Sequence, residues 1–200
     1  RSSECKTFQK NGSDIARSAD DIGELTALLA ATPVLAQRVE QWREHTRVQA
    51  LRLEARARLM RLMQRTVQWL HEDGPQQGVT TEGVLRFIDW IETLLRRESY
   101  LAMLLERPAV HERLLRLLGV AKWPARYLIQ HPAVIDELTS NAMLEERFSA
   151  ADFQDDLRRR IESLQSTGED DEETLLNLLR RAMHAETFRT LARDLDGRLT

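Results

Sequence analysis

The stretch that decides the fold reads FIDWIETLLRRESYLAMLLERPAVHERLLRLLG at residues 87–119 and continues through Lys122-Trp123-Pro124 to HPAVIDEL at residues 131–138. Serine, proline and glycine divide it into short apolar runs with helical spacing. That pattern predicts three or four short helices with sharp boundaries. The stretch therefore indicates a helical scaffold rather than a site.

Two parts of this stretch repeat each other. LLERPAVHERL at residues 104–114 aligns without gaps on LIQHPAVIDEL at residues 128–138, and LAATPV at residues 29–34 is a fainter third copy. Each copy predicts a helix that ends before a proline and a second helix that the proline begins. Such corners converge on similar sequences, and two clear copies are fewer than a helical solenoid needs. We interpret the copies as corners between helices.

The rest of the chain has the same periodicity of about 3.6 residues. Further helices are expected at about residues 21–31, at residues 48–72, and from the acidic run at residues 169–173 to about residue 196. Three more are expected to begin at Pro33 after a Thr32 cap, at Thr80 or Thr81, and after a Ser149 cap. No stretch alternates apolar and polar residues long enough to predict a strand. We therefore predict an all-α fold, an irregular bundle of about eight or nine helices with helix–proline–helix corners.

The apolar stripes of these helices predict the core. Clusters around Trp42, Trp90 and Trp123 are expected to be buried, and Trp69 is placed on a core-facing position. The long helix is expected to turn inward Leu51, Ala55, Leu59, Leu62, Met63, Thr66 and Leu70. The last helix is expected to turn inward Leu175, Leu176, Leu179, Met183, Leu191 and Leu195.

Composition limits the class of protein. The chain has 200 residues, of which 42% are hydrophobic and 30% charged, with a formal net charge of −3. This charge gives no global attraction to nucleic acid or to an anionic membrane. The single cysteine, Cys5, cannot form an internal disulfide, and no apolar run approaches the roughly 20 residues of a membrane-spanning helix. These features predict a cytoplasmic protein.

The sequence predicts no catalytic, cofactor-binding or metal-binding residue. The histidines at 45, 71, 111, 131 and 184 lack metal-ligand spacing, and no nucleophile motif occurs. Asp20-Asp21 and Asp194-Leu195-Asp196 superficially match the paired carboxylates of nucleotidyltransferases. Adjacent strand residues point to opposite faces, and helix positions i and i+2 do not face each other. Both are therefore interpreted as structural.

One charged feature is a candidate partner surface. Seven arginines lie between residues 43 and 65, and four of them are expected on one flank of the long helix: Arg47, Arg58, Arg61 and Arg65. Such a flank is most often solvated, and the aliphatic parts of its arginine side chains cover the edge of the core. An acidic protein partner ranks second. Nucleic acid ranks last, because RNA-binding proteins usually add exposed aromatic side chains for stacking.

Several motifs resemble a known family. They are RARLMRL at residues 56–62, SYLA at residues 99–102 followed by Pro108, LLG at residues 117–119, Trp123, the HPAVIDEL segment, and RDLDG at residues 193–197. Together they are similar to the helical middle of bacterial glutamine synthetase adenylyltransferase, the glutamate–ammonia ligase adenylyltransferase family. The chain departs from the family pattern at Ala121-Lys122, at Pro124 and at Asp196, where a small residue is usual.

The resemblance implies a multifunctional parent enzyme with two nucleotidyltransferase units that use ATP and Mg²⁺. One unit attaches AMP to a tyrosine of glutamine synthetase and the other removes it, while glutamine and the PII signalling protein set the balance. Residues 21–145 are then expected to be a helical connector and regulatory segment, and residues 146–200 a helical lead-in to a catalytic unit that is not present. Residues 1–20 are expected to be a mobile leader.

The resemblance also implies that this chain is inactive alone, because it holds neither catalytic motif. Its expected partners are glutamine synthetase, PII and the flanking catalytic units, without membrane or nucleic acid. The alternative is a stand-alone helical adaptor that binds an acidic protein or RNA through the arginine flank.

Overall fold

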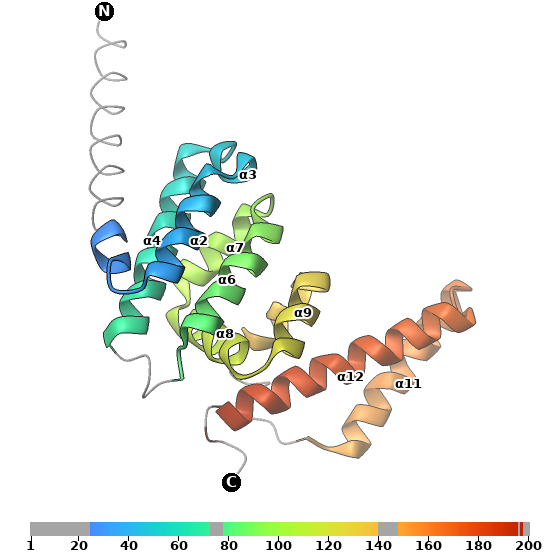
Figure 1. Ribbon diagram of the computed structural model, residues 1–200. Helices are drawn as coiled ribbons and strands as arrows, with labels where there is room; N and C mark the ends of the chain where they lie inside the picture. The colour runs from blue at the N-terminus through green and yellow to red at the C-terminus, as the bar shows by residue number, and fades with distance from the viewer. Residues whose placement is uncertain (1–24, 73–77, 140–147, 196, 198–200) are drawn as a thin grey trace, which may run out of the picture. The chain divides into compact units, whose positions relative to one another are not determined.

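A computed structural model describes residues 25–72, 78–139, 148–195 and 197, and every regular element within them is helical (Figure 1). The prediction of an all-α fold is confirmed. Residues 25–29 are helical. The other elements are nine α-helices and one 3-10 helix: α2 (Pro33–Glu44), α3 (Thr46–Gln49), α4 (Leu53–Glu72), α6 (Thr81–Leu94), α7 (Glu98–Glu106), α8 (Pro108–Val120), α9 (Lys122–Gln130), η1 (Pro132–Leu138), α11 (Ala150–Thr167) and α12 (Glu172–Leu195).

The helix predicted at residues 48–72 is interrupted between Gln49 and Leu53. The short α3 ends at Gln49, and α4 begins at Leu53, so Leu51 lies between helices and is half-buried. A local cap explains α3, because the imidazole Nδ1 of His45 accepts a hydrogen bond from the backbone N–H of Arg47 at 3.2 Å. The Gln49 side chain then donates to the carbonyl of Arg43 at 2.6 Å, which closes the turn.

The predicted helix–proline–helix corners are present at all three positions. The residues before the prolines, Thr32, Arg107 and His131, have φ of −135°, −122° and −128° and ψ of 82°, 78° and 66°. This shared conformation follows from the clash that keeps a residue before proline out of the helical region. In it the Thr32 hydroxyl accepts no hydrogen bond, so the predicted side-chain cap is wrong. Thr80, with ψ of 154°, does accept one from Gly83 N–H at 3.0 Å.

Backbone contacts divide the chain into two compact units between Pro132 and Ala133, and each is described by itself. In the first unit α6 is central and packs against α2, α4, α8 and α9 (Figure 1). Its apolar residues are buried on more than one side, as expected for a core helix. Trp42 is 1% exposed and Trp90 is fully buried, which confirms two of the predicted core clusters.

Two glycines set how closely α6 and α8 approach. A Cβ atom on Gly83 would lie 2.9 Å from the carbonyl oxygen of Leu115 and 3.0 Å from the Cα of Gly119. A Cβ on Gly119 would lie 2.9 Å from the Thr80 hydroxyl. Backbone therefore meets backbone at this crossing, and neither position has room for a side chain.

The prediction that Trp123 is buried is wrong. Trp123 is 44% exposed because the buried face of α9 is formed by Pro124, Ala125, Tyr127 and Leu128. Its ring stacks on Tyr127, with centroids 5.7 Å apart and planes at 17°. Trp69, also predicted to face the core, is half-buried.

The second unit contains an α11–α12 hairpin (Figure 1). Ser149 caps α11 by accepting a hydrogen bond from Asp152 N–H at 3.3 Å, and Gly168 ends it with a left-handed φ of 73°. Asp171 caps α12 by accepting bonds from the backbone N–H and the hydroxyl of Thr174 at 3.1 and 2.6 Å. These hydrogen bonds lower the pKa of the Asp171 carboxyl.

The inward placement of three residues of α12 is wrong. Leu176, Leu179 and Met183 are 42%, 38% and 61% exposed. Leucines also occupy positions 175 and 178, so the first half of α12 is apolar on two sides. The single partner helix of a hairpin covers only one of these two apolar sides of α12, and the sequence pattern does not indicate which side is covered.

Candidate interaction sites

The structure distributes the four arginines of the predicted flank over two helices. Arg47 lies in α3 and is exposed, whereas Arg58, Arg61 and Arg65 lie in α4. Arg61 is exposed. Arg58 is half-buried, and its guanidinium lies 3.8 Å from a carboxylate oxygen of Glu54. Arg65 points into the structure and bonds to other parts of the chain, so the first three arginines form the outward part of the flank.

Arg65 joins α4 to the corner between α7 and α8. Its guanidinium donates to the backbone carbonyls of Leu104 and Leu105, at 2.5 and 3.1 Å, where α7 ends. It also donates through Nε to the imidazole Nδ1 of His111 at 3.1 Å, and it lies 5.2 Å from the ring centroid of Trp69. Arg65 therefore satisfies carbonyls that the end of a helix leaves without an intrahelical partner.

His111 is the buried centre of this network. It is fully buried, between Trp69 and Phe87, whose ring centroids lie 5.1 and 4.9 Å from its own. Its Nδ1 accepts from Arg65, so its Nε2 carries the proton and donates to the Thr66 hydroxyl at 2.9 Å. Thr66 in turn donates to the carbonyl of Leu62 at 2.7 Å. Each polar atom of the chain Arg65–His111–Thr66–Leu62 thus has a partner.

Burial and the nearby charge keep His111 neutral. Removal from water lowers the pKa of the imidazole well below its ordinary range, and the positive charge of Arg65 lowers it further. Burial also lowers the pKa of Arg65, which remains charged. Thr66 lies on the predicted apolar stripe of the long helix, and a polar residue among leucines is the one sign in the sequence of a buried hydrogen-bond partner.

A second site is a cleft of about 270 Å³ in the α11–α12 hairpin. Two phenylalanines are the apolar part of its lining: Phe148 is 54% exposed, and its ring centroid lies 5.8 Å from that of Phe153. The rest is polar. Its lining comprises Ser149, Asp152, Asp156, Arg159, Arg160, Glu186, Arg189 and Arg193.

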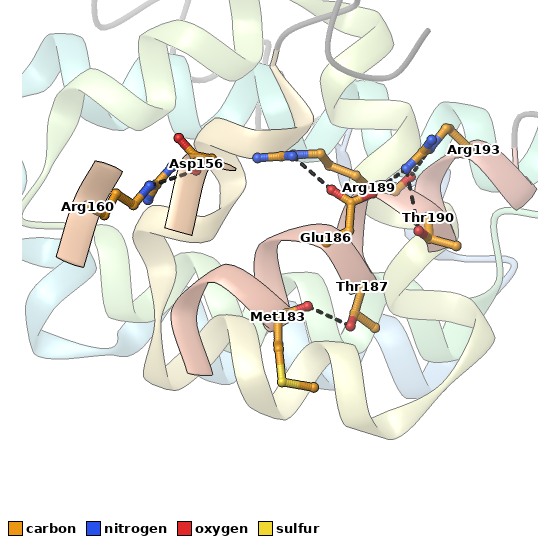
Figure 2. A network of polar contacts seen from close by, with 8 residues as sticks. All are labelled: Asp156, Arg160, Met183, Glu186, Thr187, Arg189, Thr190 and Arg193. Carbon is orange, nitrogen blue, oxygen red and sulfur yellow. Dashed lines mark hydrogen bonds and ion pairs between the residues drawn. The ribbon is translucent and has the colours of Figure 1, made fainter. Parts of the chain in front are cut away.

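The charged lining includes two carboxylates, Asp156 and Glu186, that are each shared by two arginines. Figure 2 shows Asp156 with Arg160, and Glu186 with Arg189 and Arg193. On α11, Asp156 pairs with Arg160 at 2.8 Å and with Arg159 at 3.6 Å. On α12, the two oxygens of Glu186 bind Arg189 at 2.9 Å and Arg193 at 2.6 Å. Glu186 and Arg193 have side chains only 16% and 5% exposed, so this second group is largely withdrawn from water. No motif in the sequence predicts this cleft.

Potential metal ligands do not cluster in the part of the chain that the structure describes. The described residues contain no group of three or more His, Cys, Asp or Glu side chains that could hold a metal ion. Asp194 is exposed near the end of α12, while Asp196 and the Asp20-Asp21 pair lie outside the described residues. Across the same residues, no helix has the length and apolarity to cross a membrane.

The described residues thus form an all-helical protein with a buried polar network and a charged cleft. The model of the family described as glutamate-ammonia ligase adenylyltransferase matches residues 111–200. The bifunctional glutamine synthetase adenylyltransferase/adenylyl-removing enzyme of Burkholderia mallei is 37% identical over 181 residues, which are 90% of this chain and 19% of that protein. The enzyme of the same description from Ralstonia nicotianae is 34% identical over 164 residues, 82% of this chain and 16% of that protein.

The Neisseria meningitidis serogroup A enzyme of that description is 32% identical over 167 residues, 82% of this chain and 17% of the relative. No solved structure matches the chain. The chain belongs to the glutamate–ammonia ligase adenylyltransferase family. It spans about one fifth of the length of the curated relatives that it matches.

Proposed function

We propose that this chain is the structural and regulatory segment of a bifunctional enzyme that adenylylates and deadenylylates glutamine synthetase. The observation that carries the proposal is the similarity over 90% of this chain to 19% of an enzyme described as having both activities. In this proposal, residues 21–145 connect two catalytic units and residues 146–200 lead into the second. The all-helical packing around α6 supports a positioning role, because rigid helices hold neighbouring units at a fixed separation.

The chemistry belongs to the rest of the parent enzyme in this proposal. The parent would transfer AMP from ATP to a tyrosine of glutamine synthetase in the cytoplasm, and Mg²⁺ bound elsewhere in the parent would supply positive charge to the nucleotide phosphates. The described residues do not fit such a metal site, since they bring no three potential ligands together. The chain itself is therefore assigned no catalytic step.

The 200-residue chain is expected to transfer no adenylyl group. Incubation with labelled ATP, Mg²⁺ and glutamine synthetase should leave the synthetase unlabelled, whereas the complete parent enzyme should label it under the same conditions. The Asp194→Asn variant of the parent should label as well as the unchanged parent, because Asp194 is exposed on a helix. Labelling by the 200-residue chain that is lost in its own Asp194→Asn variant would contradict the assignment.

We propose Arg47, Arg58, Arg61 and Arg65 as the partner surface, with Arg65 supporting the other three from within. The double variant Arg47→Glu/Arg61→Glu of the parent should weaken binding of PII by about tenfold, and added salt should have a similar effect. Its denaturation midpoint should be unchanged because both side chains are exposed. Arg65→Glu should instead lower the midpoint, since it leaves two helix-end carbonyls and His111 without their donor.

The matched control for the flank is Arg96→Glu/Arg126→Glu, which reverses two exposed arginines outside α3 and α4. It should bind PII as tightly as the unchanged parent. If all the variants bound PII with equal affinity, the arginine flank would be a solvated surface without a role in binding. Salt-sensitive RNA binding by the 200-residue chain would favour the adaptor alternative.

A further inference from the structure

The first half of α12 exposes an apolar stripe, which consists of Leu176, Leu179 and Met183. These residues follow one another at positions i, i+3 and i+7, so they lie on one face of the helix. All three are exposed, and Met183 is the most exposed of them at 61%. The a and d positions through which two helices pack together have the same spacing. The stripe therefore has the form of a helix-packing surface.

The stripe is separate from the charged cleft, whose lining contains none of its three residues. Figure 2 shows the side chain of Met183 directed away from the ion pairs of Glu186. One turn further along, the exposed Thr187 donates its hydroxyl to the carbonyl of Met183 at 2.7 Å. Because this bond satisfies the hydroxyl within the helix, Thr187 can also meet an apolar surface.

The α11–α12 hairpin has little core of its own near the stripe. No residue of α11 is buried, and the buried residues of α12, which are Phe188, Ala192 and Arg193, all lie in its second half. A helix that is apolar on two sides is typical of a bundle in which it has neighbours on both sides. The first half of α12 therefore has room and apolar surface for a third helix.

The small size of the stripe favours a segment of the same polypeptide over a separate molecule. Stable interfaces between separate proteins contain about 20–30 residues on each side, whereas the stripe has three. A tethered segment needs less contact, because a short linker holds it at an effective concentration of about millimolar. The relatives have the length to supply one, since about four fifths of each lies outside the part that this chain matches.

We infer that the stripe of Leu176, Leu179 and Met183 packs against an amphipathic helix of the same enzyme that lies outside these 200 residues, so that α11, α12 and this third helix form one bundle. The inference rests on the proposed function, since it takes the chain to be a segment of a longer enzyme. The third helix is expected to present apolar side chains at spacings of three and four residues.

Oxidation of Met183 by hydrogen peroxide, followed by mass spectrometry, measures whether the stripe is covered. Met183 should form its sulfoxide at least about tenfold more slowly in the complete parent enzyme than in the 200-residue chain, because a covered thioether is less accessible to the peroxide. Met63, which is fully buried in α4, should oxidise slowly in both proteins and serves as the internal reference.

Variants of the parent test whether the apolar stripe causes the protection. In Leu176→Gln/Leu179→Gln, Met183 should oxidise as fast as in the short chain, because glutamine keeps the helix but removes the apolar contact. Leu176→Ile/Leu179→Ile keeps the stripe apolar and should keep most of the protection. The matched control, Asn177→Gln/Arg181→Gln, changes two exposed residues of α12 outside the stripe and should leave the protection intact.

The helix content of the 200-residue chain should be the same with and without Leu176→Gln/Leu179→Gln, which separates lost packing from unfolding of α12. Equal oxidation of Met183 in the short chain and the parent would overturn the inference, as would protection that survives Leu176→Gln/Leu179→Gln. Protection of the short chain that rises with its concentration would instead assign the stripe to a second copy. Protection of the parent only after glutamine synthetase or PII is added would assign it to a separate protein, and either result would also overturn the inference.

The outcome is independent of the test of function. A parent that protects Met183 but does not label glutamine synthetase would retain the third helix and remove the proposed activity. A parent that labels the synthetase while Met183 stays unprotected would do the reverse.

Discussion

Replacing Trp90 with alanine should lower the free energy of unfolding by about 3–5 kcal/mol, the range for truncating a large buried aromatic side chain. Trp90 is fully buried in α6, the helix that contacts four others, and its ring centroid lies 6.0 Å from that of Phe87. Removing the indole leaves a cavity that the rigid helices around it cannot fill. Urea denaturation followed by circular dichroism measures the loss as a shift of the midpoint.

Two further tryptophan variants make this test specific. Trp90→Phe should cost less than Trp90→Ala, because phenylalanine fills most of the space and removes an indole N–H that has no described hydrogen-bond partner. Trp123→Ala should cost about 1 kcal/mol, the scale of one exposed aromatic stacking contact. An unchanged midpoint for Trp90→Ala would show that its side chain is a surface contact.

Most features that depend on neighbouring residues in the sequence were predicted correctly, although the Thr32 side-chain cap was not. The prolines at 108 and 132 give the corners because the restriction on the preceding residue is local. The caps at Thr80 and Ser149 are also local, since each oxygen accepts from an N–H three residues ahead. The burial of Trp90 follows from an apolar helix too hydrophobic to lie at the surface.

Features that depend on packing between distant segments were not predicted from the sequence. The break after α3 was also missed although it is local, because the hydrogen bonds made by the His45 and Gln49 side chains compete there with a continuous helix. Trp123 is exposed because the orientation of α9 is set by its neighbours in the first unit. Both sides of α12 are apolar over its first half, and the arrangement of the hairpin decides which is exposed.

The candidate sites, too, were predicted only as far as they depend on local sequence. The arginine content of α3 and α4 is visible in the sequence, but the role of Arg65 depends on His111, which lies 46 residues further along the chain. In the cleft, ion pairs such as Asp156–Arg160 have the ordinary i, i+4 spacing of a solvated helix face. What distinguishes them is the approach of α11 to α12, which no local pattern encodes.

The stability of the chain should fall as the pH drops below about 6.5, and His111 should account for part of that fall. The pKa of His111 is held well below its ordinary range by burial and by the charge of Arg65. The unfolded chain binds a proton on this residue at about pH 6.5, whereas the folded chain does not. At pH values between the unfolded and folded pKa values, the free energy of unfolding therefore falls by up to about 1.4 kcal/mol for each pH unit of acidification. At higher pH both states are neutral at His111, and its contribution is constant.

Urea denaturation between about pH 5 and pH 8, on the unchanged chain and on His111→Leu, measures this contribution. The variant should be less stable at the upper end of that range, because Arg65 and Thr66 lose their partner. Its stability should also depend less on pH below about 6.5, since the titrating group is gone. The exposed His71 provides the control, and His71→Gln should keep the full pH dependence. If His111→Leu and the unchanged chain lost stability in parallel as the pH fell, the imidazole would be taking up its proton in the folded state, and the buried Arg65–His111–Thr66 chain of hydrogen bonds would have to open at mild acidity.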